Sequence, residues 1–127
     1  MDKRKALVVD DEFHIVQVVS IKLKNNGFEV MTAENGQLAY DLACRDCPDI
    51  IVTDYQMPAM SGLELIQKLR QNDETAHVPV IMLTARGFSI EDDQKEQLNI
   101  AACLSKPFSP REVLQTIEEV LAQSAAI

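Results

Sequence analysis

Polar side chains that can do chemistry stand directly after several short apolar runs of this sequence. In chain order they are Asp10, Asp11 and Glu12, then Asp54, then Thr84, and last Lys106. If the apolar runs are strands of one parallel sheet, their carboxyl ends share an edge, and the groups that follow them converge there. The sequence therefore predicts carboxylates, a hydroxyl and an ammonium group gathered at one edge of a sheet.

Carboxylates that converge in this way require positive charge. Unit charges about 4 Å apart repel by about 4 kcal/mol at an effective dielectric constant of about 20. Carboxylate and carbonyl oxygens with open positions for water suit Mg²⁺ or Mn²⁺, and Lys106 supplies a second positive charge. A cation, an ammonium group and the Thr84 hydroxyl together can bind the oxygens of a phosphoryl group. Asp54 is then the expected nucleophile, and an aspartyl phosphate is its product.

Each of these residues also has an ordinary explanation when it is considered alone. An acidic pair after a strand is most often a solvated turn or the first turn of a helix. Asp54 would suit a turn, Thr84 suits a strand, and Lys106 would suit a solvated loop. Their joint occurrence at one edge of one sheet favours a functional site.

The elements that must position this site alternate along the chain. Apolar runs rich in β-branched residues predict strands at 6–9, 29–33, 50–52, 80–83 and 101–105, the second of them mixed in polarity like an edge strand. Helical periodicity predicts helices at 12–26, 36–46, 62–71, 90–98 and 110–123, with Val18 on the apolar stripe of the first and Leu38 on that of the second. This alternation predicts an α/β fold, a doubly wound five-stranded parallel sheet with five helices on its two faces.

Local signals mark several helix ends. Residues 61–64 and 109–112 both read Ser-x-x-Glu, the sequence of a capping box. The 90–98 segment has few apolar residues to bury, so it is predicted to be the most loosely held helix. Asn99 can adopt the left-handed conformation that often ends a helix.

Composition limits the class of protein. A length of 127 residues predicts a single domain over 1–127. With 12 Lys+Arg against 20 Asp+Glu, the net charge of −8 argues against direct binding to nucleic acid or an anionic membrane. The longest apolar run, 100–104, is too short to span a membrane. Three cysteines without a secretory signal suit reduced thiols in the cytoplasm.

The ordered set of motifs resembles a known family. The motifs are Val8-Val9-Asp10-Asp11-Glu12, Ile51-Val-Thr-Asp54-Tyr-Gln-Met-Pro58, Met60-Ser-Gly62, Leu83-Thr84-Ala85 and Ser105-Lys106-Pro107-Phe108. Together they are similar to those of a two-component response-regulator receiver domain. The resemblance covers residues 5 to 122, essentially the whole chain. It implies a flavodoxin-like sheet with the strand order 2-1-3-4-5.

The resemblance also implies roles for individual residues. Asp54 corresponds to the phospho-acceptor, Lys106 to the lysine that contacts the phosphoryl group, and Thr84 to the hydroxyl that hydrogen-bonds it. The Mg²⁺ ligands correspond to Asp11, Asp54 and the backbone carbonyl of Gln56, with Asp10 acting through water. Gln56 and Arg86 flank the phosphoryl group, where side chains tune its hydrolysis.

In this family the donor is a phosphohistidine on a sensor histidine kinase or a phosphotransfer protein. The implied function is a signalling switch that catalyses only its own phosphorylation and dephosphorylation and is otherwise not an enzyme. Phosphorylation is expected to change the 90–123 face, which then binds a downstream protein.

One position departs from the family. Three residues before the lysine, where receivers usually carry Tyr or Phe, this sequence has Cys103. In the family, movement of the hydroxyl equivalent to Thr84 is coupled to rotation of that aromatic ring, and a thiol cannot replace the ring. We therefore expect the signal to pass through the loop after Thr84 and the helix at 90–98.

Alternatives remain. A haloacid-dehalogenase-like enzyme would carry D-x-D after its first strand and a cap insertion, whereas here the candidate nucleophile follows the third strand and no cap insertion is present. A flavin module would need a Ser/Thr-rich phosphate loop after the first strand, where this sequence has an acidic cluster. A receiver that no longer takes phosphate is disfavoured because every required group is present. The Cys44-x-x-Cys47 spacing lacks a second ligand pair for zinc, so two surface thiols near a helix end are expected.

Overall fold

The chain folds into strands and helices in strict alternation. The computed structural model describes residues 4–57, 59–85 and 92–125. Its strands are β1 (Arg4–Val9), β2 (Phe28–Ala33), β3 (Ile50–Asp54), β4 (Val80–Thr84) and β5 (Ile100–Ser105). Its helices are α1 (Phe13–Lys24), α2 (Gly36–Asp46), α3 (Gly62–Gln71), α4 (Asp92–Leu98) and α5 (Pro110–Ala125). Every predicted element is present, with small shifts at its ends.

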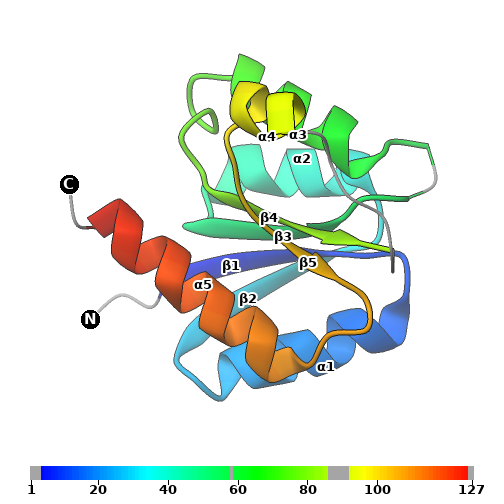
Figure 1. Ribbon diagram of the computed structural model, residues 1–127, viewed down its shortest axis with the longest axis vertical. Coiled ribbons are helices and arrows are strands. Elements are labelled where there is room, and N and C mark those ends of the chain that lie inside the picture. Colours follow the sequence, from blue (N-terminus) through cyan, green and yellow to red (C-terminus); the bar gives the residue numbers. More distant parts are fainter. Residues whose placement is uncertain (1–3, 58, 86–91, 126–127) are drawn as a thin grey trace.

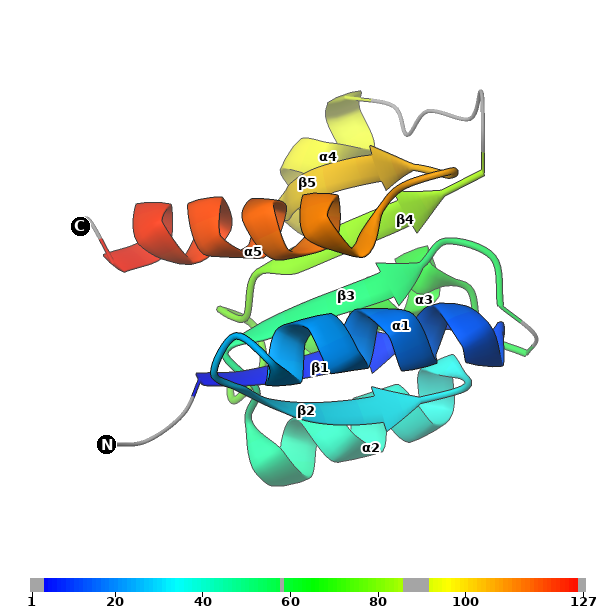
Figure 2. The same cartoon turned by 90° about the horizontal axis from the view of Figure 1, so that it is seen from below.

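The strands form one sheet in the order β2-β1-β3-β4-β5. All neighbouring pairs are parallel, which confirms the expected sheet and its strand order. β2 lies at an edge, as its mixed polarity predicted. Because the strands share one direction, their carboxyl ends lie along the same side of the molecule (Figure 2).

Helices cover both faces of the sheet. α1 and α5 lie on one face, and α2, α3 and α4 lie on the other (Figure 1). Alternate residues of the central strands supply the two cores. Val8, Val52 and Ile81 pack toward α1 and α5, whereas Leu7 and Ile51 pack toward α2 and α3. This double coverage explains why the central strands are apolar runs with little alternation.

The helix ends follow the local sequence signals. In each capping box the serine hydroxyl accepts a hydrogen bond from the glutamate backbone N–H, and the glutamate carboxylate accepts one from the serine backbone N–H. The distances are 3.2 and 3.4 Å for Ser61 with Glu64, and 3.1 and 3.3 Å for Ser109 with Glu112. Asn99 follows α4 with φ of 53°, in the predicted left-handed conformation. None of the helices within the described ranges is long and apolar enough to cross a bilayer.

Some burial predictions were wrong. Val18 and Leu38, which were assigned to buried stripes, are 46% and 41% exposed. Leu38 lies in the first turn of α2 beside β2, at the edge of the sheet, and Val18 lies at the margin of the α1 stripe. Cys44 is half-buried because α3 packs on α2, and its Sγ accepts a hydrogen bond from Asn72 Nδ2 at 3.4 Å. Cys47 alone of the two thiols is exposed.

Candidate functional site

Three residues that are distant in sequence meet at the carboxyl edge of the sheet. Asp10 follows β1, Asp54 ends β3, and Lys106 follows β5. The Nζ atom of Lys106 lies 3.4 Å from Oδ2 of Asp54 and 3.6 Å from Oδ2 of Asp10. The convergence expected from a parallel sheet therefore holds for these residues.

A fourth residue, Glu12, makes the shortest contact with the lysine. Its Oε1 atom accepts a hydrogen bond from Lys106 Nζ at 3.0 Å. From the sequence, Glu12 was part of the acidic run after β1 but had no role of its own. The sequence feature that could have identified Glu12 is its position directly after the acidic pair. The chain turns into α1 at this point, which places the Glu12 side chain at the carboxyl edge of the sheet.

Asp10 is a buried carboxylate whose two oxygens differ. Oδ1 accepts the Glu12 backbone N–H at 2.9 Å. Oδ2 is buried and has no hydrogen-bond partner among the described residues. Burial, opposed in part by the Glu12 backbone hydrogen bond, raises the pKa of Asp10 from 3.8 to about 6, with a further contribution from the charge of Asp54. This carboxylate is therefore poorly compensated by the protein alone.

Asp54 is held rigidly beside it. The backbone N–H of Tyr55 donates to Leu83 O at 2.8 Å, which extends the sheet by one bond beyond Asp54. The backbone N–H of Gly62 donates to Tyr55 O at 2.8 Å, so α3 starts directly against this turn. A Cβ atom on Gly62 would lie 2.5 Å from Asp54 O, which explains why the position requires glycine. Burial raises the pKa of Asp54, and the neighbouring Lys106 ammonium opposes that rise.

Lys106 carries the positive charge of the site. Its backbone N–H donates to Thr84 O at 2.8 Å, so the end of β4 fixes its position. Burial favours its neutral form, but the hydrogen bond to Glu12 and the charges of Asp10 and Asp54 outweigh burial and raise its pKa. Lys106 therefore remains an ammonium group at neutral pH.

A cavity of about 450 Å³ opens over these groups. Asp54 and Lys106 line it together with Asp11 and Gln56. Asp11 and Gln56 are both exposed, so their side chains border the mouth of the cavity. Four of the predicted residues, Asp11, Asp54, Gln56 and Lys106, thus line one opening large enough for a phosphoryl group and a hydrated cation.

Thr84 is placed differently from the other predicted residues. It is 3% exposed, and its Oγ1 atom donates a hydrogen bond to Leu104 O at 3.4 Å. The hydroxyl is therefore engaged with β5, and the residue is not among those that line the cavity. Arg86, predicted to flank the phosphoryl group, lies outside the described residues.

Comparison with known proteins connects this geometry to a family. Residues 6–118 match the family described as response regulator receiver domain. The chain belongs to that family. The receiver domain is 39% identical over 121 residues to the phosphate regulon transcriptional regulatory protein PhoB of Pseudomonas aeruginosa, covering 93% of this chain and 52% of that protein. It is 36% identical to the alkaline phosphatase synthesis transcriptional regulatory protein PhoP of Bacillus subtilis, covering 95% of this chain and 50% of that protein.

The receiver domain therefore spans about half the length of the curated relatives it matches. Among solved structures it is similar to the chemotaxis response regulator CheY4 of Vibrio cholerae, with a TM-score of 0.85, 33% identity, and 94% of this chain and 99% of that chain covered. These matches confirm the resemblance that the motifs indicated and the flavodoxin-like fold.

The acidic groups of this receiver domain fit a divalent cation. One carboxylate oxygen from each of Asp10, Glu12 and Asp54 lies within 4.8 Å of the others. The buried Oδ2 of Asp10 lacks a hydrogen-bond donor among the described residues, and hard oxygen ligands suit Mg²⁺. Asp11 is exposed at the cavity and outside this close group. Direct ligation by Asp11 with Asp10 acting through water, as the family implies, stays a prediction.

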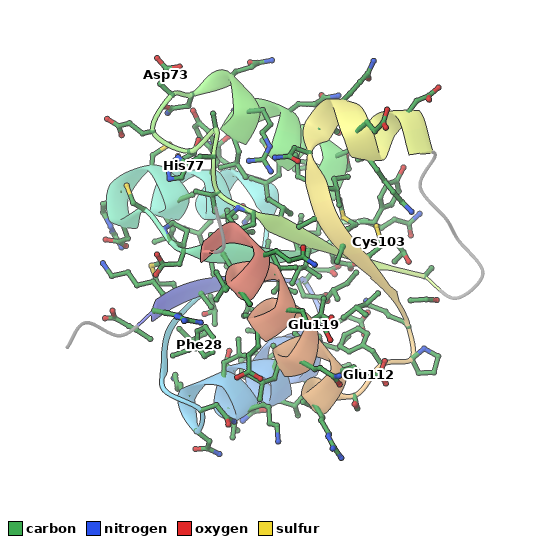
Figure 3. The ribbon with its side chains drawn as sticks, turned by 60° about the vertical axis from the view of Figure 1, so that its left-hand side comes forward. Phe28, Asp73, His77, Cys103, Glu112 and Glu119 are labelled. Carbon is green, nitrogen blue, oxygen red and sulfur yellow. The ribbon has the colours of Figure 1, made fainter. Side chains whose placement is uncertain are left out.

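The departure at Cys103 has a clear structural setting. Cys103 lies on β5 (Figure 3), paired with Met82 of β4, and packs on the core beneath α2 and α3. Burial raises the pKa of its thiol, although Lys95 of α4 opposes the shift. The side chain is therefore a small half-buried neutral group where receivers usually carry an aromatic ring.

Proposed function

We propose that this receiver domain is a phosphorylation-operated switch that accepts a phosphoryl group on Asp54 from a phosphohistidine. The donor is a sensor histidine kinase or a histidine phosphotransfer protein. The observation that supports this most directly is the Asp54 carboxylate at a cavity of about 450 Å³, with the Lys106 ammonium 3.4 Å away. Mg²⁺, or Mn²⁺ in its place, is the proposed cofactor.

In the proposed reaction an oxygen of Asp54 forms a bond to phosphorus, and the bond from phosphorus to the imidazole nitrogen of the donor breaks. The imidazole keeps the electron pair. Lys106 stabilises charge on the transferred oxygens, and the Thr84 hydroxyl turns from Leu104 O to hydrogen-bond one of them. Asp11, Asp54 and the backbone carbonyl of Gln56 would hold Mg²⁺, with Asp10 acting through water, and the bound ion would supply positive charge that offsets the repulsion between carboxylates and phosphate.

Incubation with acetyl phosphate and Mg²⁺ tests the proposal, because a small donor replaces the kinase. Intact-mass spectrometry should find one phosphoryl group on the wild type and none on Asp54→Asn. Asp73→Asn is the matched control, since Asp73 is an exposed aspartate between α3 and β4 (Figure 3). Undiminished labelling of Asp54→Asn would place the nucleophile elsewhere.

The proposed switch catalyses only its own phosphorylation and dephosphorylation and is not an enzyme toward other substrates. Uptake should therefore stop near one phosphoryl group per chain and be followed by slow release. Rapid turnover of excess acetyl phosphate would instead favour an enzyme that works through an aspartyl phosphate.

We propose that the output is a protein contact on the 90–123 face, in the cytoplasm, with no direct role for nucleic acid or membrane. The named relatives PhoB and PhoP are transcriptional regulatory proteins, which makes gene regulation one destination of such a signal. The downstream partner of this chain would be selected by the phosphorylation state of Asp54.

A further inference from the structure

Glu12 stands at the start of α1 without capping it. It occupies the N-cap position with extended backbone angles, but its side chain makes no cap hydrogen bond within the described chain. Asn, Asp, Ser and Thr are the residues that cap helices well. The Glu12 carboxylate is instead turned to Lys106, at 3.0 Å, while the hydrogen bond from Lys106 to Asp54 is 3.4 Å long.

The Lys106 ammonium has little capacity left for a further partner. A lysine has three N–H donors. Here hydrogen bonds run to Glu12 and Asp54, and Asp10 Oδ2 lies 3.6 Å from Nζ without accepting one. A phosphoryl oxygen that binds Lys106 therefore competes with three nearby carboxylates for its N–H groups and positive charge.

Glu12 is the carboxylate able to leave. Asp54 carries the phosphoryl group, and the Asp10 side chain is fully buried and fixed by the Glu12 backbone N–H. The Glu12 side chain is 46% exposed and has a longer stem, so water can replace the lysine around it. Its second oxygen, Oε2, lies 3.7 Å from His14 Nε2 at the protein surface.

The negative charge of Glu12 opposes phosphoryl transfer, as does its hydrogen bond to Lys106. Carboxylate oxygens of Asp10, Glu12 and Asp54 lie within 3.6 Å of the Lys106 ammonium, and Asp11 lines the same cavity. A phosphoryl donor is itself an anion, so every uncompensated carboxylate at the cavity opposes its approach. Glu12 adds negative charge at the cavity without being the acceptor.

We propose that Glu12 is a positioning residue that restrains phosphoryl transfer: it holds Lys106 in the unphosphorylated protein and releases it when Asp54 is phosphorylated. This inference rests on the proposed phosphorylation of Asp54. The bond from phosphorus to the leaving group breaks as the bond to Asp54 forms, and the leaving group keeps the electron pair. Lys106 exchanges its hydrogen bond with Glu12 for one with a phosphoryl oxygen, and no proton is transferred.

The rate of labelling by acetyl phosphate tests this restraint. Glu12→Gln keeps the length of the side chain but replaces a charge-assisted hydrogen bond by a weaker neutral acceptor. Loss of an exposed ion pair of this kind should speed labelling about fivefold. Glu34→Gln is the matched control, because Glu34 is an exposed acid that follows β2 at the same edge of the sheet. Its labelling rate should equal that of the wild type.

An unchanged or slower rate in Glu12→Gln would overturn the inference, since Glu12 would then be neutral or would position Lys106 productively. Failure of the wild type itself to take the label would instead remove the proposed function. Mg²⁺ affinity, measured by calorimetry, should fall only modestly in Glu12→Gln, because one nearby negative charge is lost while the metal ligands remain. A collapse of Mg²⁺ affinity in Glu12→Gln would identify Glu12 as a metal ligand and contradict the restraint.

A crystal structure with Mg²⁺ and beryllofluoride, an analogue of the phosphoryl group, gives a readout that is independent of rate. We expect Lys106 Nζ to contact a fluoride and the Glu12 carboxylate to lie beyond hydrogen-bond distance of it. A Glu12–Lys106 hydrogen bond that persists beside bound beryllofluoride would overturn the inference.

Discussion

At the scale of single residues, the site is dominated by carboxylates that the protein alone compensates poorly. Asp10 is the extreme case, buried with one oxygen that lacks a hydrogen-bond donor among the described residues. Residue types and their order in the sequence were sufficient to predict that Asp10, Asp54 and Lys106 would meet. The contact between Glu12 and Lys106 depends on a side-chain conformation, which no spacing rule specifies. The engagement of the Thr84 hydroxyl with β5 was unpredictable for the same reason.

Replacement of Asp10 should stabilise the metal-free protein. Its pKa is raised from 3.8 to about 6, so folding is penalised once the pH rises above its value in the unfolded chain. Asp10→Asn should therefore raise the free energy of unfolding by about 2 kcal/mol at pH 7.5 without Mg²⁺. Urea denaturation measures this difference, which should shrink as the pH falls below about 6 and disappear below pH ~3, where Asp10 is protonated in both states. The exposed Asp93→Asn is the control, and an Asp10→Asn protein less stable than the wild type at pH 7.5 would contradict the prediction.

We expect Lys106 to be required for the conformational response but not for Mg²⁺ binding. Lys106→Ala removes a positive charge from the acidic cluster, so Mg²⁺ affinity should be retained or rise. The conformational response to the phosphoryl group should be lost. In the proposed switch the Lys106 side chain contacts that group, and its backbone is attached to the ends of β4 and β5. Calorimetry measures the first effect, and amide chemical shifts with and without beryllofluoride measure the second. A collapse of Mg²⁺ affinity in this variant would be incompatible with the proposed role.

At the scale of elements, the contacts between helix starts and strand ends set the geometry of the site. α3 begins against the turn after Asp54, and this close approach requires Gly62. The sequence contained the glycine and the capping box, but neither reveals that a backbone oxygen lies where a Cβ atom would stand. The exposure of Leu38 was missed for a related reason, since helical periodicity does not tell how far a neighbouring element reaches.

Gly62→Ala should lower the free energy of unfolding by about 2 kcal/mol, because the added Cβ atom would stand against a backbone oxygen. It should also slow labelling of Asp54, since α3 must move relative to β3. Gly36→Ala is the matched control at the start of α2, where the three atoms nearest to the added Cβ are side-chain atoms of Met60 (Cβ, Cγ and Sδ), each at 2.9 Å, and not a backbone oxygen. Urea denaturation should find the Gly36→Ala loss clearly smaller, and equal losses would refute the steric argument.

Arg70 attaches α4 to α3. Its guanidinium donates hydrogen bonds to backbone oxygens that precede β4 and that end α4, namely those of Thr75, Ala76, Val78, Leu98 and Asn99. Burial lowers its pKa, yet an arginine remains charged at neutral pH. The looseness predicted for α4 is thus countered at its carboxyl end by a residue on another helix.

Arg70→Ala should therefore cost about 2 kcal/mol in the free energy of unfolding, because several half-buried carbonyls lose their donor. Hydrogen exchange should accelerate most at α4 and the first residues of β5. The exposed Arg111→Ala removes the same charge from α5 and should change neither quantity appreciably. Unaltered exchange in α4 of Arg70→Ala would contradict the proposed attachment.

At the scale of the whole molecule, the parallel sheet joins the edge that carries Asp54 to the face formed by α4, β5 and α5. Thr84 ends β4 and Lys106 directly follows β5, so a change at either residue in the proposed switch would act on those strands. Sequence alternation was sufficient to predict a doubly wound parallel sheet, because each βα repeat imposes the same crossover, whereas the strand order was implied by the resemblance to receiver domains. The route of the signal past Cys103 could not be predicted from the sequence. That route depends on how neighbouring side chains fill the space that an aromatic ring occupies in other receivers.

Amide chemical shifts locate that route. Addition of beryllofluoride with Mg²⁺ should shift signals across residues 85–106 if the loop after Thr84 and α4 carry the response. Replacement of Cys103 by Tyr should enlarge the change on α5, because a ring restores the coupling that the family uses. An unchanged spectrum across 85–106, in a protein shown to bind beryllofluoride, would refute this route.

β1 begins and α5 ends on the side of the sheet away from the strand carboxyl ends (Figure 2). A fluorescent protein or an affinity handle joined at either place would therefore lie on the side of the sheet opposite Asp54. Sensors and immobilised forms of this domain built in that orientation would leave the cavity at Asp54 open to the proposed donor.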